Sequence, residues 1–132
     1  MAHRFATSIR TARAQAIIDA AGAGAKWKHY DGTKPATLGG TPAGTLLATH
    51  TCGSVMGTAA SGVLTLDIAN YSNVAGSNVS GTQTFARLET SGGTPVWDVD
   101  YGVGSANIQS TGDVVGGQAF AFGTSTLTMP NA

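Results

Sequence analysis

The distribution of apolar and polar residues divides the chain into a short helical stretch and a long β-rich remainder. Apolar residues recur at helical spacing over residues 5–21, and Gly22 follows as a residue that ends helices. This spacing predicts one amphipathic helix within an N-terminal arm of residues 1–22. Its apolar positions are Phe5, Ile9, Ala12, Ala16, Ile17 and Ala20, with Arg10, Arg13 and Asp19 outside that face or at its margin.

The pattern changes to alternation after the helix. The stretch "KWKHY" predicts a strand from Lys26 to Tyr30, closed by an Asp31-Gly32 turn, with Trp27 and His29 on one face. From Thr45 onward the alternating stretches are "TLLATHTCG", "VMGTAASGVLTLDIANY", "GTQTFARLET", "TPVWDVDYG", a weak "ANIQS" and "FAFGTSTLTM". Turn signals every ~8 to 12 residues predict an antiparallel β-sandwich, jelly-roll-like, or a small barrel over residues 26–132.

A hairpin over residues 81–102 is the plainest of these signals. With Gly92 and Gly93 as a two-residue turn, the predicted register places Arg87 opposite Asp98 on one face. The same register pairs Leu88 with Trp97, Ala86 with Val99 and Thr84 with Tyr101 on the other face. We therefore expect the core to include Leu88, Trp97, Val99 and Tyr101.

Composition and charge narrow the functional classes. A chain of 132 residues fits one domain, and charged residues make up 11%, which predicts a weakly charged surface. Seven basic and seven acidic residues cancel, so net charge favours neither nucleic acid nor an acidic membrane. The basic residues nevertheless gather in the first 34 positions, ahead of an acidic body. A solvated helix face explains this simply, while docking on an acidic partner or on other copies is the alternative.

Two pairs of residues are candidates for catalytic groups. In His50-Thr51-Cys52, alternation puts an imidazole and a thiol on one strand face, as a nucleophile and its base would require, although a buried cysteine with an incidental histidine is the simpler interpretation. Asp98 and Asp100 likewise share a face, as in part of a hard-cation site, but a solvent-facing ion pair between Asp98 and Arg87 is favoured. We expect no catalytic residue, no metal and no cofactor.

Other sequence features point away from secretion and from membranes. Cys52 is the single cysteine and has no internal disulfide partner, and the N-terminal stretch lacks the apolar run of a signal peptide, so we expect synthesis in a reducing cytoplasm. The helix is too rich in alanine to hold a bilayer strongly. The stretch "KWKHY" is a thin platform for nucleic acid, and a strand that packs Trp27 into the core is favoured.

Several stretches together resemble a known group of proteins. They are "RFATSIRTARAQAIIDAAGAGAKWKHYDGTKPA", "GTLLATHTCGS", "GVLTLDIAN" and "GTQTFARLETSGGTPVWDVDYGVGSANIQSTGDVVGGQAFAFGTSTLTM". In this order they resemble a group of small structural proteins encoded by tailed bacteriophages, and the resemblance covers nearly the whole chain.

This resemblance implies assembly rather than catalysis. It implies a protein of the virion, most simply a capsid decoration or cement protein that contacts the major capsid protein and copies of itself, usually as trimers. A neck or tail component is the alternative, and a sugar-binding or enzymatic β-sandwich is a third reading. The candidate interface residues are Phe5, Ile9, Arg10, Arg13, Ile17, Trp27 and Tyr30.

Overall fold

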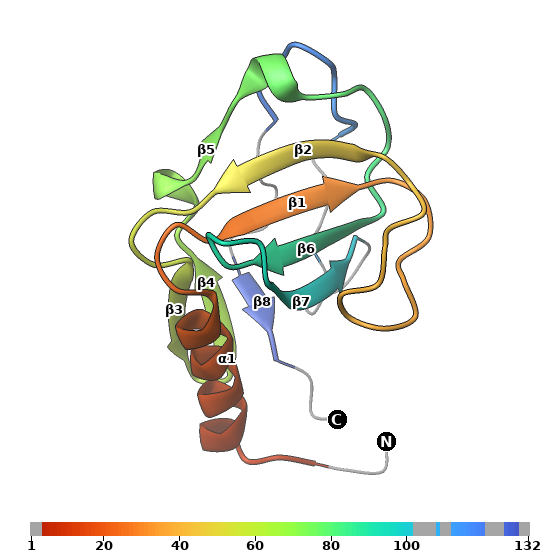
Figure 1. Cartoon of the computed structure of the whole chain (residues 1–132). Coiled ribbons are helices and arrows are strands. Elements are labelled where there is room, and N and C mark those ends of the chain that lie inside the picture. Colours follow the sequence, from red (N-terminus) through yellow and green to blue (C-terminus); the bar gives the residue numbers. More distant parts are fainter. Residues whose placement is uncertain (1–3, 102–107, 109–111, 121–125, 130–132) are drawn as a thin grey trace.

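The chain forms one N-terminal helix and two antiparallel sheets in a computed structural model that describes residues 4–101, 108, 112–120 and 126–129 (Figure 1). Helix α1 spans Thr7–Ala21. The larger sheet has the order β5-β2-β1-β6-β7, with β1 at Lys26–Tyr30, β2 at Leu46–Thr51, β5 at Ser72–Asn73, β6 at Phe85–Glu89 and β7 at Pro95–Asp100. The smaller sheet has the order β3-β4-β8, with β3 at Gly57–Ala60, β4 at Val63–Leu66 and β8 at Thr126–Thr128, and two short 3₁₀ helices lie at Ile68–Asn70 and Ala75–Ser77.

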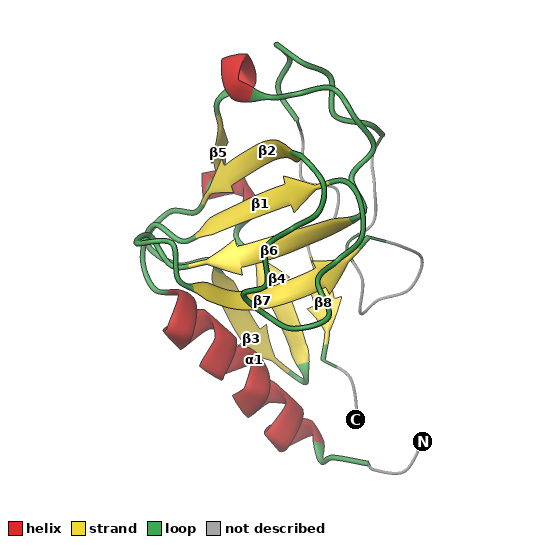
Figure 2. Cartoon of the chain, turned by 45° about the vertical axis from the view of Figure 1, so that its right-hand side comes forward, coloured by secondary structure: helices red, strands yellow, loops and turns green. Residues whose placement is uncertain are grey.

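The mainly β character with one helix is confirmed, whereas the barrel alternative is wrong, because the described strands belong to two separate sheets (Figure 2). One hydrophobic cluster joins the helix to both sheets. It contains Ala14 and Ile18 of α1, Trp27 of the larger sheet, and Leu64 and Leu127 of the smaller sheet. Burial of this shared apolar surface is the main term that holds the three elements together.

Strand β1 lies at the centre of the larger sheet and matches its predicted bounds. It pairs antiparallel with β2 on one edge and with β6 on the other. Trp27 and His29 are fully buried on the inner face, while Lys28 lies on the outer face and is partly exposed. Gly32 has a φ of +77°, which the predicted Asp31-Gly32 turn requires and which glycine adopts without strain.

The β6–β7 hairpin has the predicted register but a different turn. Leu88 pairs with Trp97, Ala86 with Val99 and Arg87 with Asp98. The amide of Thr90 donates to the carbonyl of Thr94 (2.9 Å), so the loop has three residues rather than the predicted Gly92-Gly93 pair. A register shift between Leu88 and Glu89 offsets the extra loop residue. The cross-strand pairs therefore remain as predicted.

The helix prediction is correct in type and end, whereas the start of the helix and its buried face differ from the predicted pattern. Helix α1 begins at Thr7 instead of residue 5, and Gly22, with a φ of +71°, ends it. The buried residues are Ala14, Ile18 and Ala21, which pack toward β3, β4 and β7. Of the six residues assigned to the apolar face, only Ile17 reaches the core, where it is partly buried. Phe5, Ile9, Ala12, Ala16 and Ala20 are exposed.

The remaining strand predictions are met in part. The stretch over residues 55–71 forms the β3–β4 hairpin, whose turn places Ser61 (φ +52°) and Gly62 (φ +75°) in the left-handed region. The predicted "ANIQS" strand lies outside the described residues except for Ile108, which forms a parallel bridge with Tyr101. In "FAFGTSTLTM", β8 covers Thr126–Thr128, and residues 121–125 lie outside the described part.

We predict that Trp27→Ala lowers the free energy of unfolding by about 3–5 kcal/mol, because it removes a fully buried indole from the shared core. Trp97→Ala should cost less, since Trp97 is partly buried and packs against the same cluster from β7. Urea unfolding followed by circular dichroism measures both. Val74→Ala, at a side chain that is 69% exposed, is the control. Equal losses for both tryptophans would contradict this ranking.

Candidate functional site

The outer face of α1 carries the first candidate surface. At about 100° per residue, Ile9, Ala12, Ala16 and Ala20 fall on one side of the helix, opposite the buried Ile18. Ile9 is 49% exposed, and the three alanines are also exposed. The helix is therefore apolar on two opposite faces, which is typical of helices that are covered on both sides.

The inner face of α1 is fixed to the β3–β4 turn by polar contacts. The hydroxyl of Thr11 accepts a hydrogen bond from the amide of Gly62 (2.7 Å). The guanidinium of Arg10 lies against the same glycine, and a Cβ built there would come within 2.9 Å of it. At the start of the helix the guanidinium of Arg13 lies over the ring of Phe5, 5.4 Å from its centroid. These contacts hold the outer apolar face in a fixed orientation.

The other two candidate interface residues lie in β1. Trp27 is completely buried and lies 5.9 Å from the ring of Trp97, so it is a core residue, as the packing interpretation of "KWKHY" predicts, and offers no surface contact. Tyr30 is half-buried and stacks on Phe85 at 5.2 Å. The predicted core residues Leu88 and Val99 are buried, whereas Trp97 and Tyr101 are partly buried and pack against the core.

The outer face of the larger sheet holds a row of ion pairs. Arg87 and Asp98 form a bidentate pair, with Nε to Oδ1 at 2.8 Å and Nη2 to Oδ2 at 3.2 Å. This pair confirms the predicted register, but its predicted exposure is wrong, because Arg87 is 4% exposed on a strand enclosed by β1 and β7. The pKa of Arg87 is raised, chiefly by its hydrogen bond to Asp98. Lys28 pairs with the buried Glu89 at 2.9 Å.

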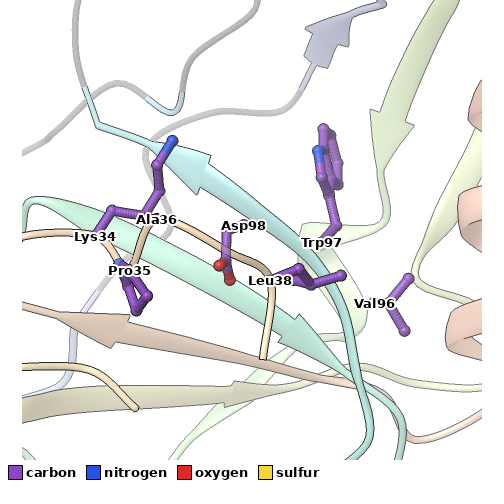
Figure 3. A pocket seen from close by; sticks show the side chains of 7 residues that line it. All are labelled: Lys34, Pro35, Ala36, Leu38, Val96, Trp97 and Asp98. Carbon is purple, nitrogen blue, oxygen red and sulfur yellow. The ribbon is translucent and has the colours of Figure 1, made fainter. Parts of the chain in front are cut away.

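A pocket of about 280 Å³ lies beside this row, between β7 and the loop after β1. Figure 3 shows Asp98 on the side of the loop residues and Trp97 on the other side of the strand. The lining residues are Lys34, Pro35, Ala36, Leu38, Val96, Trp97 and Asp98. Its charged members already have partners, since Asp98 binds Arg87 and Lys34 binds Asp100 at 2.9 Å. Asp98 and Asp100 thus form ion pairs with different basic residues instead of forming one cation site.

A chain of hydrogen bonds on the inner face is the feature that sequence reasoning missed. The hydroxyl of Tyr101 lies 2.5 Å from Nδ1 of His29, and Nε2 of His29 lies 2.9 Å from Nδ1 of His50. Nε2 of His50 lies 2.7 Å from the carbonyl oxygen of Phe120. His29 is fully buried and His50 is 4% exposed, and the ring of Phe120 packs against both.

The chemistry of the end groups sets the direction of this chain. A carbonyl oxygen can only accept, so Nε2 of His50 carries a proton and, in the neutral ring, Nδ1 accepts. Nε2 of His29 must then donate to His50, which leaves Nδ1 of His29 to accept from the hydroxyl of Tyr101. One arrangement with two neutral rings satisfies all three bonds. Burial lowers the pKa of both histidines, and His50 lowers that of His29 further.

The hypothesis that His50 activates Cys52 does not fit this geometry. Both ring nitrogens of His50 bind groups other than Cys52. Burial raises the pKa of the Cys52 thiol to about 11, and the side-chain hydrogen bond to Tyr71 lowers it less. The thiol is therefore protonated at neutral pH and a poor nucleophile. Among the described residues, no group of three or more His, Cys, Asp or Glu side chains is placed to hold a metal ion.

A regular alternation in two strands is the signal that could have located the histidine pair. His29 shares a face with Trp27, and His50 lies opposite Trp27 across the β1–β2 pairing. The register of that pairing does not follow from the sequence, because residues 31–45 form a long connection between the two strands. Tyr101 and Phe120 come from still more distant parts of the chain.

Comparisons with protein-family models, with curated proteins and with solved structures find no match for this chain. Within the described part of the chain, no helix has the length and hydropathy needed to cross a membrane.

We predict that Asp98→Ala lowers the free energy of unfolding by about 3 kcal/mol or more, because the buried Arg87 loses its counterion. Asp100→Ala is the matched control on the same strand, and its exposed pair with Lys34 should contribute under about 1 kcal/mol. In the double variant Arg87→Met/Asp98→Leu, most of the loss should be recovered. Urea unfolding measures all three, and equal effects at the two aspartates would contradict the assignment.

We also predict that Cys52 reacts slowly with a thiol reagent in the folded protein. At a pKa of about 11 the thiolate is at least about a hundredfold scarcer than in an exposed cysteine. The reaction with an aromatic disulfide, followed by absorbance at neutral pH, should be slow until concentrated urea exposes the thiol. A rapid reaction of the folded protein would show that Cys52 is accessible and activated.

Proposed function

We propose that this protein is a structural component of a tailed-bacteriophage virion, most simply a decoration or cement protein that stabilises the capsid shell. The observation that carries the proposal is the outer apolar face of α1, formed by Ile9, Ala12, Ala16 and Ala20. Ile9 is 49% exposed, and Phe5, just before the helix, is 40% exposed. A chain that exposes these residues gains stability when another subunit covers them.

The composition of this face suits helix packing against a neighbouring subunit. Alanine side chains allow another helix or strand to approach closely, and Ile9 supplies a larger apolar contact at one end. Arg13 beside Phe5 adds a cation at the margin, which favours a partner with acidic groups there. In this proposal the partners are the major capsid protein and further copies of the chain, as a trimer.

The two sheets serve as a rigid scaffold in this proposal, arranged as a sandwich around the shared core. Charged side chains of the sheet form ion pairs with one another, as in Arg87–Asp98 and Lys28–Glu89. The surface that remains is weakly charged, which is tolerable where neighbouring subunits cover it. A cement protein acts by binding the assembled shell, so many weak apolar contacts add up over its copies.

The copy number in purified virions, measured by quantitative mass spectrometry against the major capsid protein, tests the proposal. A ratio near one per capsid subunit supports shell decoration. A copy number that matches a single ring of subunits per particle would assign the protein to the neck or tail. Absence from the particle would overturn both structural assignments.

We predict that Ile9→Glu and Ala16→Glu each reduce incorporation into particles at least about tenfold, because each places a carboxylate in the proposed contact. Neither change touches the buried face of α1, so the melting temperature of the isolated protein should stay near that of the wild type. Val74→Glu is the control, at an exposed apolar residue beside the second 3₁₀ helix, far from α1 (Figure 1). Normal incorporation of both helix variants would show that α1 is not the contact.

A further inference from the structure

The hydrogen-bonded chain from Tyr101 to Phe120 connects parts of the molecule that are far apart in the sequence. His29 lies in β1 and His50 in β2, Tyr101 follows β7, and Phe120 ends the described segment 112–120. The carbonyl of Phe120 is held by an imidazole at 2.7 Å. The bond between the segment and the inner face of the larger sheet thus depends on a titratable group.

With both imidazoles neutral, all three bonds form without a charge in the buried cluster. A proton added at Nδ1 of His50 would face the N–H of His29 at 2.9 Å, so His29 would have to move its own proton to Nδ1 and donate to the hydroxyl of Tyr101. The bonds would then persist, but the pair would carry a positive charge in a buried site. A proton added at Nδ1 of His29 would place a positive charge on a ring with no exposed surface. Either proton leaves a positive charge in the buried cluster. The bond to the carbonyl of Phe120 favours a charged His50, but burial disfavours it more, so the pKa of His50 is lowered overall and acid favours a state in which the ring reaches water.

The neighbouring titratable groups stay uncharged in the same pH range. Tyr71 packs against His50, with ring centroids 6.4 Å apart, and Cys52 follows His50 on the same face. Burial is the main cause that raises the pKa of Cys52, Tyr71 and Tyr101. Asp67 acts on Cys52 and Tyr71 and contributes to those increases.

The charged groups of the larger sheet lie on its other face. Lys28 and Arg87 alternate along β1 and β6 with the inward-facing His29 and Ala86, to which they are adjacent in sequence. Their acidic partners, Glu89 and Asp98, lie on the same outer face. Between mildly acidic and neutral pH, the groups of this inner cluster that change charge are therefore the two histidines.

We propose that the chain Tyr101–His29–His50–Phe120 is an acid-sensitive latch, which holds Phe120 on the inner face of the larger sheet at neutral pH and releases it when the histidines are protonated. The release is local, because a side-chain amide that does not titrate holds the rest of the segment: Nδ2 of Asn78 donates to the carbonyl of Gln118 (2.6 Å). The bond from the amide of Phe120 to Oδ1 of Asn73 (2.9 Å) is lost together with the bond to His50. This inference stands independently of the proposed virion role.

The pH range follows from the direction of the pKa shifts. The pKa of each histidine is lower in the folded protein than its ordinary value near 6.5, so the unfolded or released form binds protons first as the pH falls. The stabilising effect of the latch is fully present above about pH 6.5 and declines below it. Carboxylates whose pKa has the ordinary value near 4 remain ionised over the upper part of this pH range.

Amide hydrogen exchange of the full chain tests the latch directly. We expect the protection of the Phe120 amide, corrected for intrinsic exchange, to fall at least about tenfold between about pH 7.5 and about pH 5. The amide of Val114, which donates to the carbonyl of Gly81, should change less. In the double variant His29→Gln/His50→Gln the side-chain amides do not titrate, so the protection should not depend on pH in this range. Unchanged protection of the wild type, or the same acid response in the double variant, would overturn the proposal.

Asn78→Ala is the matched control, because it removes a bond to the same segment that does not titrate. This substitution should lower the protection by the same factor at both pH values, so the ratio of the protection at about pH 7.5 to that at about pH 5 should stay unchanged. A change in the ratio comparable to that of the double variant would mean that anchoring in general, and not the histidines, governs the response.

Nuclear magnetic resonance of the wild-type imidazoles keeps the proposal testable if the double variant does not fold. Both rings should carry their proton on Nε2 at neutral pH, and both should titrate with a pKa below the ordinary value for histidine. The protection of the Phe120 amide against exchange should fall with the same midpoint in pH. A different tautomer in either ring would overturn the latch. Titration of the histidines with a pKa near about 6.5, while the Phe120 amide stays protected, would overturn it as well.

Discussion

The position of β1 at the centre of the larger sheet is the constraint on which the rest of the structure depends. Both edges of β1 are paired, and other parts of the chain pack on its inner face, so Trp27 and His29 are removed completely from water. For Trp27 this is favourable, since a large apolar surface is buried. For His29 it is costly unless both ring nitrogens find partners and the ring stays neutral. The placement of His50, Tyr101 and Phe120 meets this requirement.

The sparse charges of the chain are used in a similar way. The sequence separates a basic head from an acidic body, and the fold brings parts of the two together, as in Lys28 with Glu89 and Lys34 with Asp100. Arg87 and Asp98 make the most buried of the three pairs. Breaking a buried pair is costly, because the remaining charge loses its partner, so this pair opposes registers that separate Arg87 from Asp98. At these positions, the basic N-terminal part and the acidic remainder of the chain form ion pairs within one molecule.

The sequence predicts well what depends on local pattern. The bounds of β1, the end of α1 at Gly22 and the register of the β6–β7 hairpin follow from alternation and turn chemistry within short stretches. The packing face of α1 did not follow, because alanines and isoleucines lie on both sides of the helix and the neighbouring β3–β4 turn decides which side is covered. The histidine pair did not follow either, since its register depends on strands separated by residues 31–45.

The two places where local rules fail are also the places where the molecule departs from the usual separation of apolar inside and polar outside. On α1, Ile9 and three alanines face outward, and on the inner face of the sheet two imidazoles are buried. Neither arrangement is favoured by the folding of one isolated chain, because the first leaves apolar surface in water and the second removes polar groups from it. Departures of this kind are concentrated at functional sites. In the proposed function a covering subunit accounts for the outer face of α1, and in the proposed latch the buried histidines hold Phe120 at neutral pH and release it in acid. Since the two features lie on different elements, a substitution in one of them leaves the contacts of the other in place.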